Sequence, residues 1–158
     1  MWMWIKQIWI RVKLEGAAPH ASRKHELLEV RDPVLFKAVC AAACLVAMAD
    51  GRVAPEEINT LKRAIRNIME ISGYAEDEAL DYFQVCADAL MANPANRLTL
   101  LHRVSAIRGR TWQARRVMRV CLELSQADHC VDSAELEVLE QLCHALALEP
   151  TQFLQQAA

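Results

Sequence analysis

The stretch from Val34 to Ala49 constrains the fold more than any other part of the sequence. Of its 16 residues, all except the charged Lys37 are apolar or small. Asp32-Pro33 just before it is typical of a helix start, because Asp caps free amides and Pro fits the first helical position. A helix that is apolar on all sides is buried, and 16 residues are too few to span a bilayer, which takes about 20. The sequence therefore predicts a helix at the centre of a core.

Helical signals continue to the end of the chain. After a turn at Asp50-Gly51, apolar residues at helical spacing and flanking Gly, Pro and Ser residues predict further helices. Their expected ranges are Pro55–Ser72, Ala75–Met91, Asn93–Gly109, Thr111–Gln126 and Ser133–Leu146, followed by a short helix opened by Pro150. A chain of 158 residues with 54% apolar residues can fill one core. The predicted fold class is all-α, a single bundle of about seven helices.

The apolar spacing also predicts which side chains face the core. In chain order these are Ile58, Leu61, Ile65, Ile68, Leu80, Phe83, Ala87, Leu90, Leu98, Leu101, Val104, Ile107, Val117, Val120, Cys121, Leu124, Leu136, Leu139, Leu142, Cys143, Phe153 and Leu154. The sequence contains six cysteines, most of them in such apolar helical runs. We therefore expect buried thiols that act as small apolar residues, in a reducing cytoplasm.

Residues 1–31 differ from the helical domain expected at 32–158. The first 14 residues mix tryptophans with cations and contain no acid: Trp2, Trp4, Lys6, Trp9, Arg11 and Lys13. This composition suits a membrane interface, and the segment is too short to span. Its apolar positions fit both a strand and one helix face. The sequence thus predicts peripheral docking at the inner face of the membrane, or a segment that covers a patch of the bundle.

Charge is segregated along the chain. Six acids and no Lys or Arg occur between Glu70 and Asp88, whereas seven arginines and no acid occur between Arg97 and Arg119. This segregation predicts two solvated faces that neighbour or pair with each other, or an arginine surface that meets an acidic partner or anionic lipid. The net charge of −2 gives no reason to expect nucleic acid as a partner.

Two short segments follow one pattern, Ala-Asp-x-x-Val-x-x-x-Glu. They begin at Ala49 and Ala127, 78 residues apart, and each lies between two apolar helical runs. If the Asp after each helix and the Glu of the next helix converge, the site is rich in oxygen. Such a site favours a hard divalent cation, calcium or magnesium, over zinc.

The same residues also have a purely structural interpretation. Asp50-Gly51 is a common turn, and Glu57 and Glu135 fall in the first turn of a helix, where acids cap free amides and stabilise the dipole. Neither turn alone is a calcium-binding EF-hand loop, because Val46 and Met48 would occupy its first two ligand positions. Both interpretations stay open at this level.

Ala-Asp-Gly-Arg-Val-Ala-Pro-Glu-Glu after an Ala-rich helix, with the second copy near the end, resembles the tellurite-resistance TerB-like family over Asp32–Leu154. The same module resembles the N-terminal domain of membrane-anchored DnaJ-type co-chaperones, although this chain has no His-Pro-Asp tripeptide. The resemblance implies an all-helical, non-enzymatic module with an acidic metal-binding surface. Carried over to this sequence, that surface comprises Asp50, Glu57, Asp128 and Glu135, with Glu56 and Asp132 as neighbours. In the second copy, His129-Cys130 replaces the usual Gly-containing pair.

Other chemistry has weaker support. Zinc binding by His129, Cys130, Cys143 and His144 lacks the Cys-x-x-Cys spacing of zinc modules. No phosphate-binding glycine loop and no Gly-x-Ser-x-Gly nucleophile motif is present. The expected function is a non-enzymatic module that binds a divalent cation or protein partners in a stress-response assembly. A membrane-surface adaptor and an enzyme with a carboxylate-bound metal are the alternatives.

Overall fold

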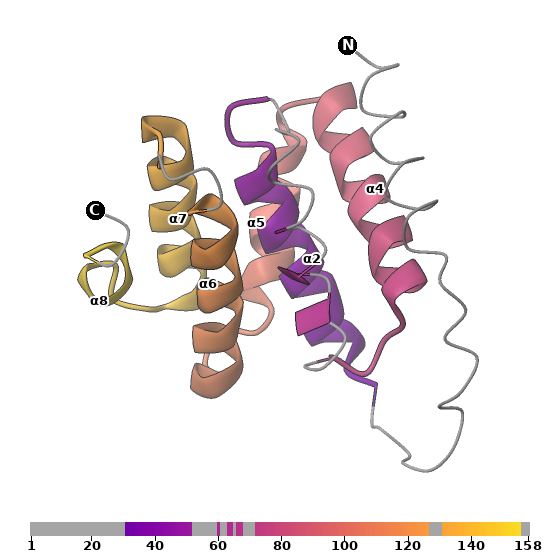
Figure 1. Ribbon diagram of the computed structural model, residues 1–158, viewed down its shortest axis with the longest axis horizontal. Helices are drawn as coiled ribbons and strands as arrows, with labels where there is room; N and C mark the ends of the chain where they lie inside the picture. The colour runs from indigo at the N-terminus through magenta and orange to yellow at the C-terminus, as the bar shows by residue number, and fades with distance from the viewer. Residues whose placement is uncertain are drawn as a thin grey trace.

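The computed structural model describes residues 31–51, 60, 63–64, 66–67, 72–126 and 131–155. These residues form helices and connecting turns and contain no strand, which confirms the predicted all-α class (Figure 1). The helices are α2 (Pro33–Ala47), α4 (Glu76–Ala92), α5 (Asn96–Ser105), α6 (Thr111–Ser125), α7 (Ser133–Leu146) and α8 (Thr151–Leu154). The helix expected at Pro55–Ser72 and the segment 1–14 lie largely or wholly outside the described residues.

Helix α2 is the centre of the bundle, as its sequence predicts. From Leu35 to Ala47 every side chain except Lys37 is buried. The helix contacts α4, α5, α6 and α7, so it has a neighbour on nearly every side. The Asp32 carboxylate caps its start by accepting the Val34 and Leu35 amides at 3.1 and 3.0 Å. Helix α2 is therefore apolar on all its faces because other helices enclose it.

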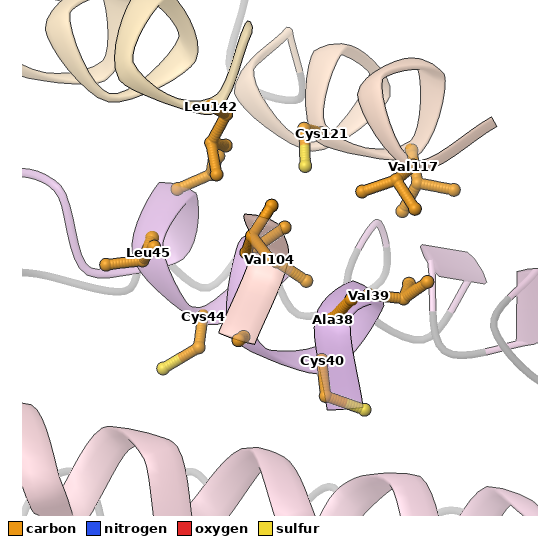
Figure 2. Packing of buried hydrophobic residues seen from close by; sticks show 14 of the residues in the cluster. Ala38, Val39, Cys40, Cys44, Leu45, Val104, Val117, Cys121 and Leu142 are labelled. Carbon is orange, nitrogen blue, oxygen red and sulfur yellow. The ribbon is translucent and has the colours of Figure 1, made fainter. Parts of the chain in front are cut away.

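The core contains sulfur on both sides of α2. Cys40 and Cys44 point away from Val117 and Cys121 of α6, which lie on the opposite side of the helix (Figure 2). The five described cysteines, Cys40, Cys44, Cys86, Cys121 and Cys143, are free and buried, which confirms their expected packing role. Burial raises the pKa of each thiol, to about 11 for Cys86 and Cys143. These thiols stay neutral and act as small apolar side chains.

Two of the predicted core positions are wrong. Leu98 is 73% exposed and Leu136 is 44% exposed. In α5 the buried residues are Leu100 and Val104, and Leu98 lies two residues, about 200° of helix rotation, from Leu100. In α7 the buried stripe begins at Glu135, so Leu136 falls at its edge. In both helices the buried stripe is displaced from the one that the leucines alone suggested.

The arginine-rich segment lies only partly beside the acidic helix α4, because α5 contacts α4 and α6 does not lie next to it. Helix α4 carries five of the six acids and α6 carries three of the seven arginines, and α2 lies between the two helices (Figures 1 and 2). Arg97 and Arg110 form their ion pairs with Glu137 and Asp32. These two arginines therefore do not pair with the acids of α4, whereas Arg103 of α5 lies beside α4 and donates to Tyr82 Oη at 2.8 Å.

Candidate functional site

The two acidic turns follow two helices of equal length. Helices α2 and α6 each have 15 residues, and they start 78 residues apart, the interval of the repeated motif. Arg110 Nη1 donates to Asp32 Oδ2 at 2.7 Å, which joins the N-terminal ends of the two helices. The helices contact each other and run in the same general direction (Figure 1). Both therefore end toward the same end of the bundle.

The first acidic turn is built by the C-terminus of α2. The Met48 and Ala49 amides bond back to the carbonyls of Cys44 and Val46, and the Gly51 amide bonds to that of Met48 at 3.2 Å. Gly51 has φ +76°, and a Cβ there would meet no atom within 4 Å. Glycine is thus required by the left-handed backbone and not by lack of space. The turn leaves Asp50 exposed to solvent.

The second acidic turn ends in a capping box at the start of α7. Asp132 Oδ1 accepts the Glu135 amide at 2.8 Å, and Glu135 Oε2 accepts the Asp132 amide at 3.1 Å. Glu135 is 8% exposed, although it carries a carboxylate. The structural role expected for this acid is confirmed. The cap occupies Oδ1 of the exposed Asp132 and leaves its Oδ2 without a partner in the described part of the chain.

The structure brings together only part of the predicted cation-binding set. Asp132 and Glu135 contact each other through the cap, and Asp50 lies on the other turn. Glu56, Glu57 and Asp128 lie outside the described residues, so the convergence of both turns stays a prediction. Among the described residues, no group of three or more His, Cys, Asp and Glu side chains has a geometry that would hold a metal ion.

The alternative zinc set is split in the same way. Cys143 is buried in the core, whereas the neighbouring His144 is exposed on the last turn of α7. The carbonyl of His144 accepts a hydrogen bond from Arg108 Nη2 at 2.9 Å. His129 and Cys130 lie outside the described residues. A metal ion in solvent could thus reach the His144 side chain but not the neighbouring Cys143 thiol.

A pocket of about 420 Å³ adjoins the first acidic turn. Its lining residues come from three segments that meet at this end of α2, namely Met48, Ala49, Asp50, Gly51, Leu90, Met91, Pro94 and Arg97. The size falls within the range of ligand pockets, about 300–1,000 Å³. Two methionines and a leucine supply an adaptable apolar surface. Asp50 and Arg97 add opposite charges to the same pocket.

Arg97 belongs to a polar network that sequence reasoning missed. Its Nε donates to Gln141 Oε1 at 3.1 Å, and Gln141 Nε2 donates to Glu137 Oε1 at 2.9 Å. Arg97 Nη2 lies 3.8 Å from the same Glu137 oxygen and, although buried, has no hydrogen-bond partner among the described residues. The only sequence signal was the spacing of Glu137 and Gln141, four residues apart on one face of α7.

The structure does not test the membrane segment. Trp2, Trp4, Lys6, Trp9, Arg11 and Lys13 lie outside the described residues. Within the described ranges, none of the helices has the length and apolar character needed to cross a bilayer.

Comparison with known proteins gives one match. The family model described as Tellurite resistance protein TerB matches residues 36–158. This range includes both acidic turns, most of α2 and all the described helices that follow it. No curated protein and no solved structure matches the chain.

Proposed function

The chain belongs to the TerB family of tellurite resistance proteins, and from this premise we propose that it is a non-enzymatic module that binds a divalent cation, calcium or magnesium. The proposed ligands come from the acidic turns that follow α2 and α6. They are Asp50, Glu56 and Glu57 of the first turn and Asp128, Asp132 and Glu135 of the second.

The arrangement of α2 and α6 is the observation that carries the proposal. Their N-terminal ends are joined by the Asp32–Arg110 ion pair, and they have equal length and one general direction (Figure 1). Two helix C-termini therefore lie toward one end of the bundle. The last carbonyls of a helix carry partial negative charge, and this attracts cations. Carboxylates placed just beyond two such ends reinforce that attraction.

The chemistry of the donors favours a hard ion. The ligands in the proposed set offer only carboxylate oxygens, which suit calcium and magnesium. The described cysteines, which would favour a softer ion, are buried and have raised pKa values. Zinc is therefore the less favoured ion.

A second candidate function, protein-partner binding, has its own support in the pocket beside Asp50. Its apolar lining of Met48, Leu90 and Met91 can receive one large apolar side chain of a partner. The opposite charges of Asp50 and Arg97 would orient polar groups that flank this side chain. Cation binding at Asp50 would then change the charge presented to the partner.

Calorimetric titration of the full chain tests cation binding. Calcium, magnesium and zinc are each titrated into the wild-type protein and into the double variant Asp50→Asn, Asp128→Asn. The matched control is Asp77→Asn with Asp88→Asn, which removes two exposed carboxylates from α4 and changes the net charge equally. We expect calcium or magnesium to bind the wild type and the control, and to bind the turn variant at least tenfold more weakly.

Two results would contradict the proposal. One is the absence of binding heat with any of the three ions. The other is an equal loss of affinity in the turn variant and the α4 control, which would mean that the ions respond to total charge and not to the turns.

A further inference from the structure

The outer face of α6 combines one tryptophan with three arginines. Trp112, Arg115, Arg116 and Arg119 follow the spacing i, i+3, i+4 and i+7, which places them on one side of the helix. Trp112 is 63% exposed. At 1.5 Å per residue, the four side chains extend along about 10 Å of helix. We call these four residues the α6 cationic face.

The rotation of α6 is fixed by the core. Ala114, Val117, Met118 and Cys121 are buried, so the opposite side of the helix faces outward. The Arg116 guanidinium carbon lies 5.2 Å from the centre of the Trp112 ring, a cation–π contact that holds the two side chains together. Arg115, Arg116 and Arg119 form no hydrogen bond or ion pair with the described part of the chain. Their charge is therefore available to an external anion.

We propose that the α6 cationic face binds the anionic headgroups of a lipid bilayer. Arginines near a surface are attracted by anionic lipids, and tryptophan prefers the boundary between headgroups and acyl chains. An exposed Trp112 beside three arginines matches both requirements. This function is separate from cation binding at the acidic turns.

The net charge of −2 does not oppose this binding, because the three arginines of α6 outnumber its one acid. That acid is Glu123, one turn after Arg119, and its Oε2 accepts a hydrogen bond from Asn67 Nδ2 at 3.3 Å. Three further exposed acids, Asp77, Asp81 and Asp88, belong to α4, and α2 separates α4 from α6 (Figures 1 and 2). Two helix-to-helix distances amount to about 16–20 Å. The Debye length is about 8 Å at physiological ionic strength. A bilayer at the α6 cationic face is therefore largely screened from the acids of α4.

The shape of the face favours lipids over a folded partner. A single convex helix with four such residues offers much less than the roughly 800 Å² per side of a stable protein interface. Lipid headgroups are separate, laterally mobile anions that can gather around a convex surface. A bilayer is thus the occupant that both the charge and the small area of the face support.

Vesicle flotation with the full-length protein tests the proposal. The vesicles contain phosphatidylcholine alone or with about one third phosphatidylglycerol. The variant Arg115→Gln, Arg116→Gln, Arg119→Gln neutralises the face. The matched variant Lys6→Gln, Arg11→Gln, Lys13→Gln removes the same charge from the N-terminal segment. We expect the wild-type protein to bind only the anionic vesicles. At low salt, the α6 variant should bind these vesicles about a hundredfold more weakly. The N-terminal variant should lose less of its affinity.

Fluorescence of a single tryptophan locates the contact. Replacing Trp2, Trp4 and Trp9 with Phe leaves Trp112 as the only tryptophan. Its emission is expected to shift to shorter wavelength on addition of anionic vesicles, and not with phosphatidylcholine alone. Circular dichroism of each variant checks that the helices are retained.

Three results would overturn the proposal. The first is unchanged flotation of the α6 variant, including the case in which only the N-terminal variant loses binding. The second is the absence of a Trp112 shift with anionic vesicles. The third is equal binding to soluble polyglutamate at the same anion concentration, which would assign the face to an acidic protein instead of a bilayer.

Discussion

The Arg110 guanidinium lies 2.7 Å from the Asp32 carboxylate, and the two residues are 78 positions apart in the chain. Each one immediately precedes the helix of its own copy, Asp32 before α2 and Arg110 before α6. Equivalent positions of the two copies therefore contact each other, as residues do near the axis of a symmetric pair. This contact aligns the two helices at their N-terminal ends and, because their lengths are equal, also at their C-terminal ends.

Removal of the Asp32 side chain is expected to destabilise the protein through α2. Asp32 caps α2 with one oxygen and bonds Arg110 with the other. Asp32→Ala loses both interactions and should lower the free energy of unfolding by about 1–2 kcal/mol. Asp32→Asn retains a capping oxygen and should cost less than about 1 kcal/mol, because the ion pair is partly exposed. Urea unfolding of both variants measures this difference, and equal losses would contradict the separate roles.

The difference in free energy of unfolding between the wild type and Asp32→Asn is expected to depend on pH. Burial alone would raise the pKa of Asp32, but the Leu35 amide, the Arg110 guanidinium and the Val34 amide outweigh it and hold the pKa below its ordinary value of 3.8. A carboxylate whose pKa is lower in the folded protein than in the unfolded chain stabilises the fold at pH values above its ordinary pKa. This stabilisation is lost as the pH falls through the pKa of the folded protein. The difference between wild type and Asp32→Asn should therefore be constant from pH 6 to 5 and shrink below about pH 4.

The two related helices should differ in their tolerance of a larger side chain. Ala41 of α2 and Arg119 of α6 occupy equivalent positions of the repeat, but Ala41 is fully buried and Arg119 is exposed. Ala41→Leu overpacks the core and should cost about 1–3 kcal/mol or more. Arg119→Leu should change stability by less than about 0.5 kcal/mol. Thermal unfolding compares the two, and a tolerated leucine at position 41 would contradict the tight packing of α2.

The capping box of α7 should stabilise the protein without a cation. Asp132→Ala removes the acceptor for the Glu135 amide and should cost about 1 kcal/mol. Because this loss comes from an uncapped helix, it should persist in the presence of a chelator. A difference between wild type and variant that appears only with added calcium would show that Asp132 stabilises the fold through the ion. Chemical unfolding with and without a chelator separates these outcomes.

The buried thiols should be unreactive in the folded protein. Burial raises the pKa of Cys86 and Cys143 to about 11, and it also raises the pKa of Cys40, Cys44 and Cys121. Iodoacetamide at pH 8 should therefore modify these five residues only after denaturant is added, as peptide mass spectrometry can show. Modification of Cys86 at the same rate in folded and unfolded protein would contradict its burial.

The same shifts predict loss of stability in alkali. A thiol with a raised folded pKa favours the folded state below its ordinary pKa of 9.0, and this contribution disappears as pH rises through the folded value. The free energy of unfolding should therefore decrease between pH 9 and pH 11. A flat profile over this interval would contradict the prediction.

The amino-acid sequence determined the fold class and most helix boundaries by local chemistry. Asp32 and Pro33 define the start of α2, Gly51 supplies the left-handed turn after it, and α7 begins and ends where its pattern predicted. The burial of α2 also followed from its own composition. These features depend on caps, turns and periodicity, all of which are encoded within a few residues.

Tertiary structure decided which faces are covered and which side chains meet. Leu98 and Leu136 are exposed because neighbouring helices cover a different stripe. Arg97 pairs with Glu137, and Arg110 with Asp32, because helices distant in the chain lie side by side. Ala41 and Arg119 occupy equivalent positions of the repeat, but Ala41 is buried and Arg119 is exposed. The difference arises because four helices enclose α2, whereas the outer side of α6 faces solvent. Such pairings depend on helix packing over tens of residues, which local periodicity does not specify.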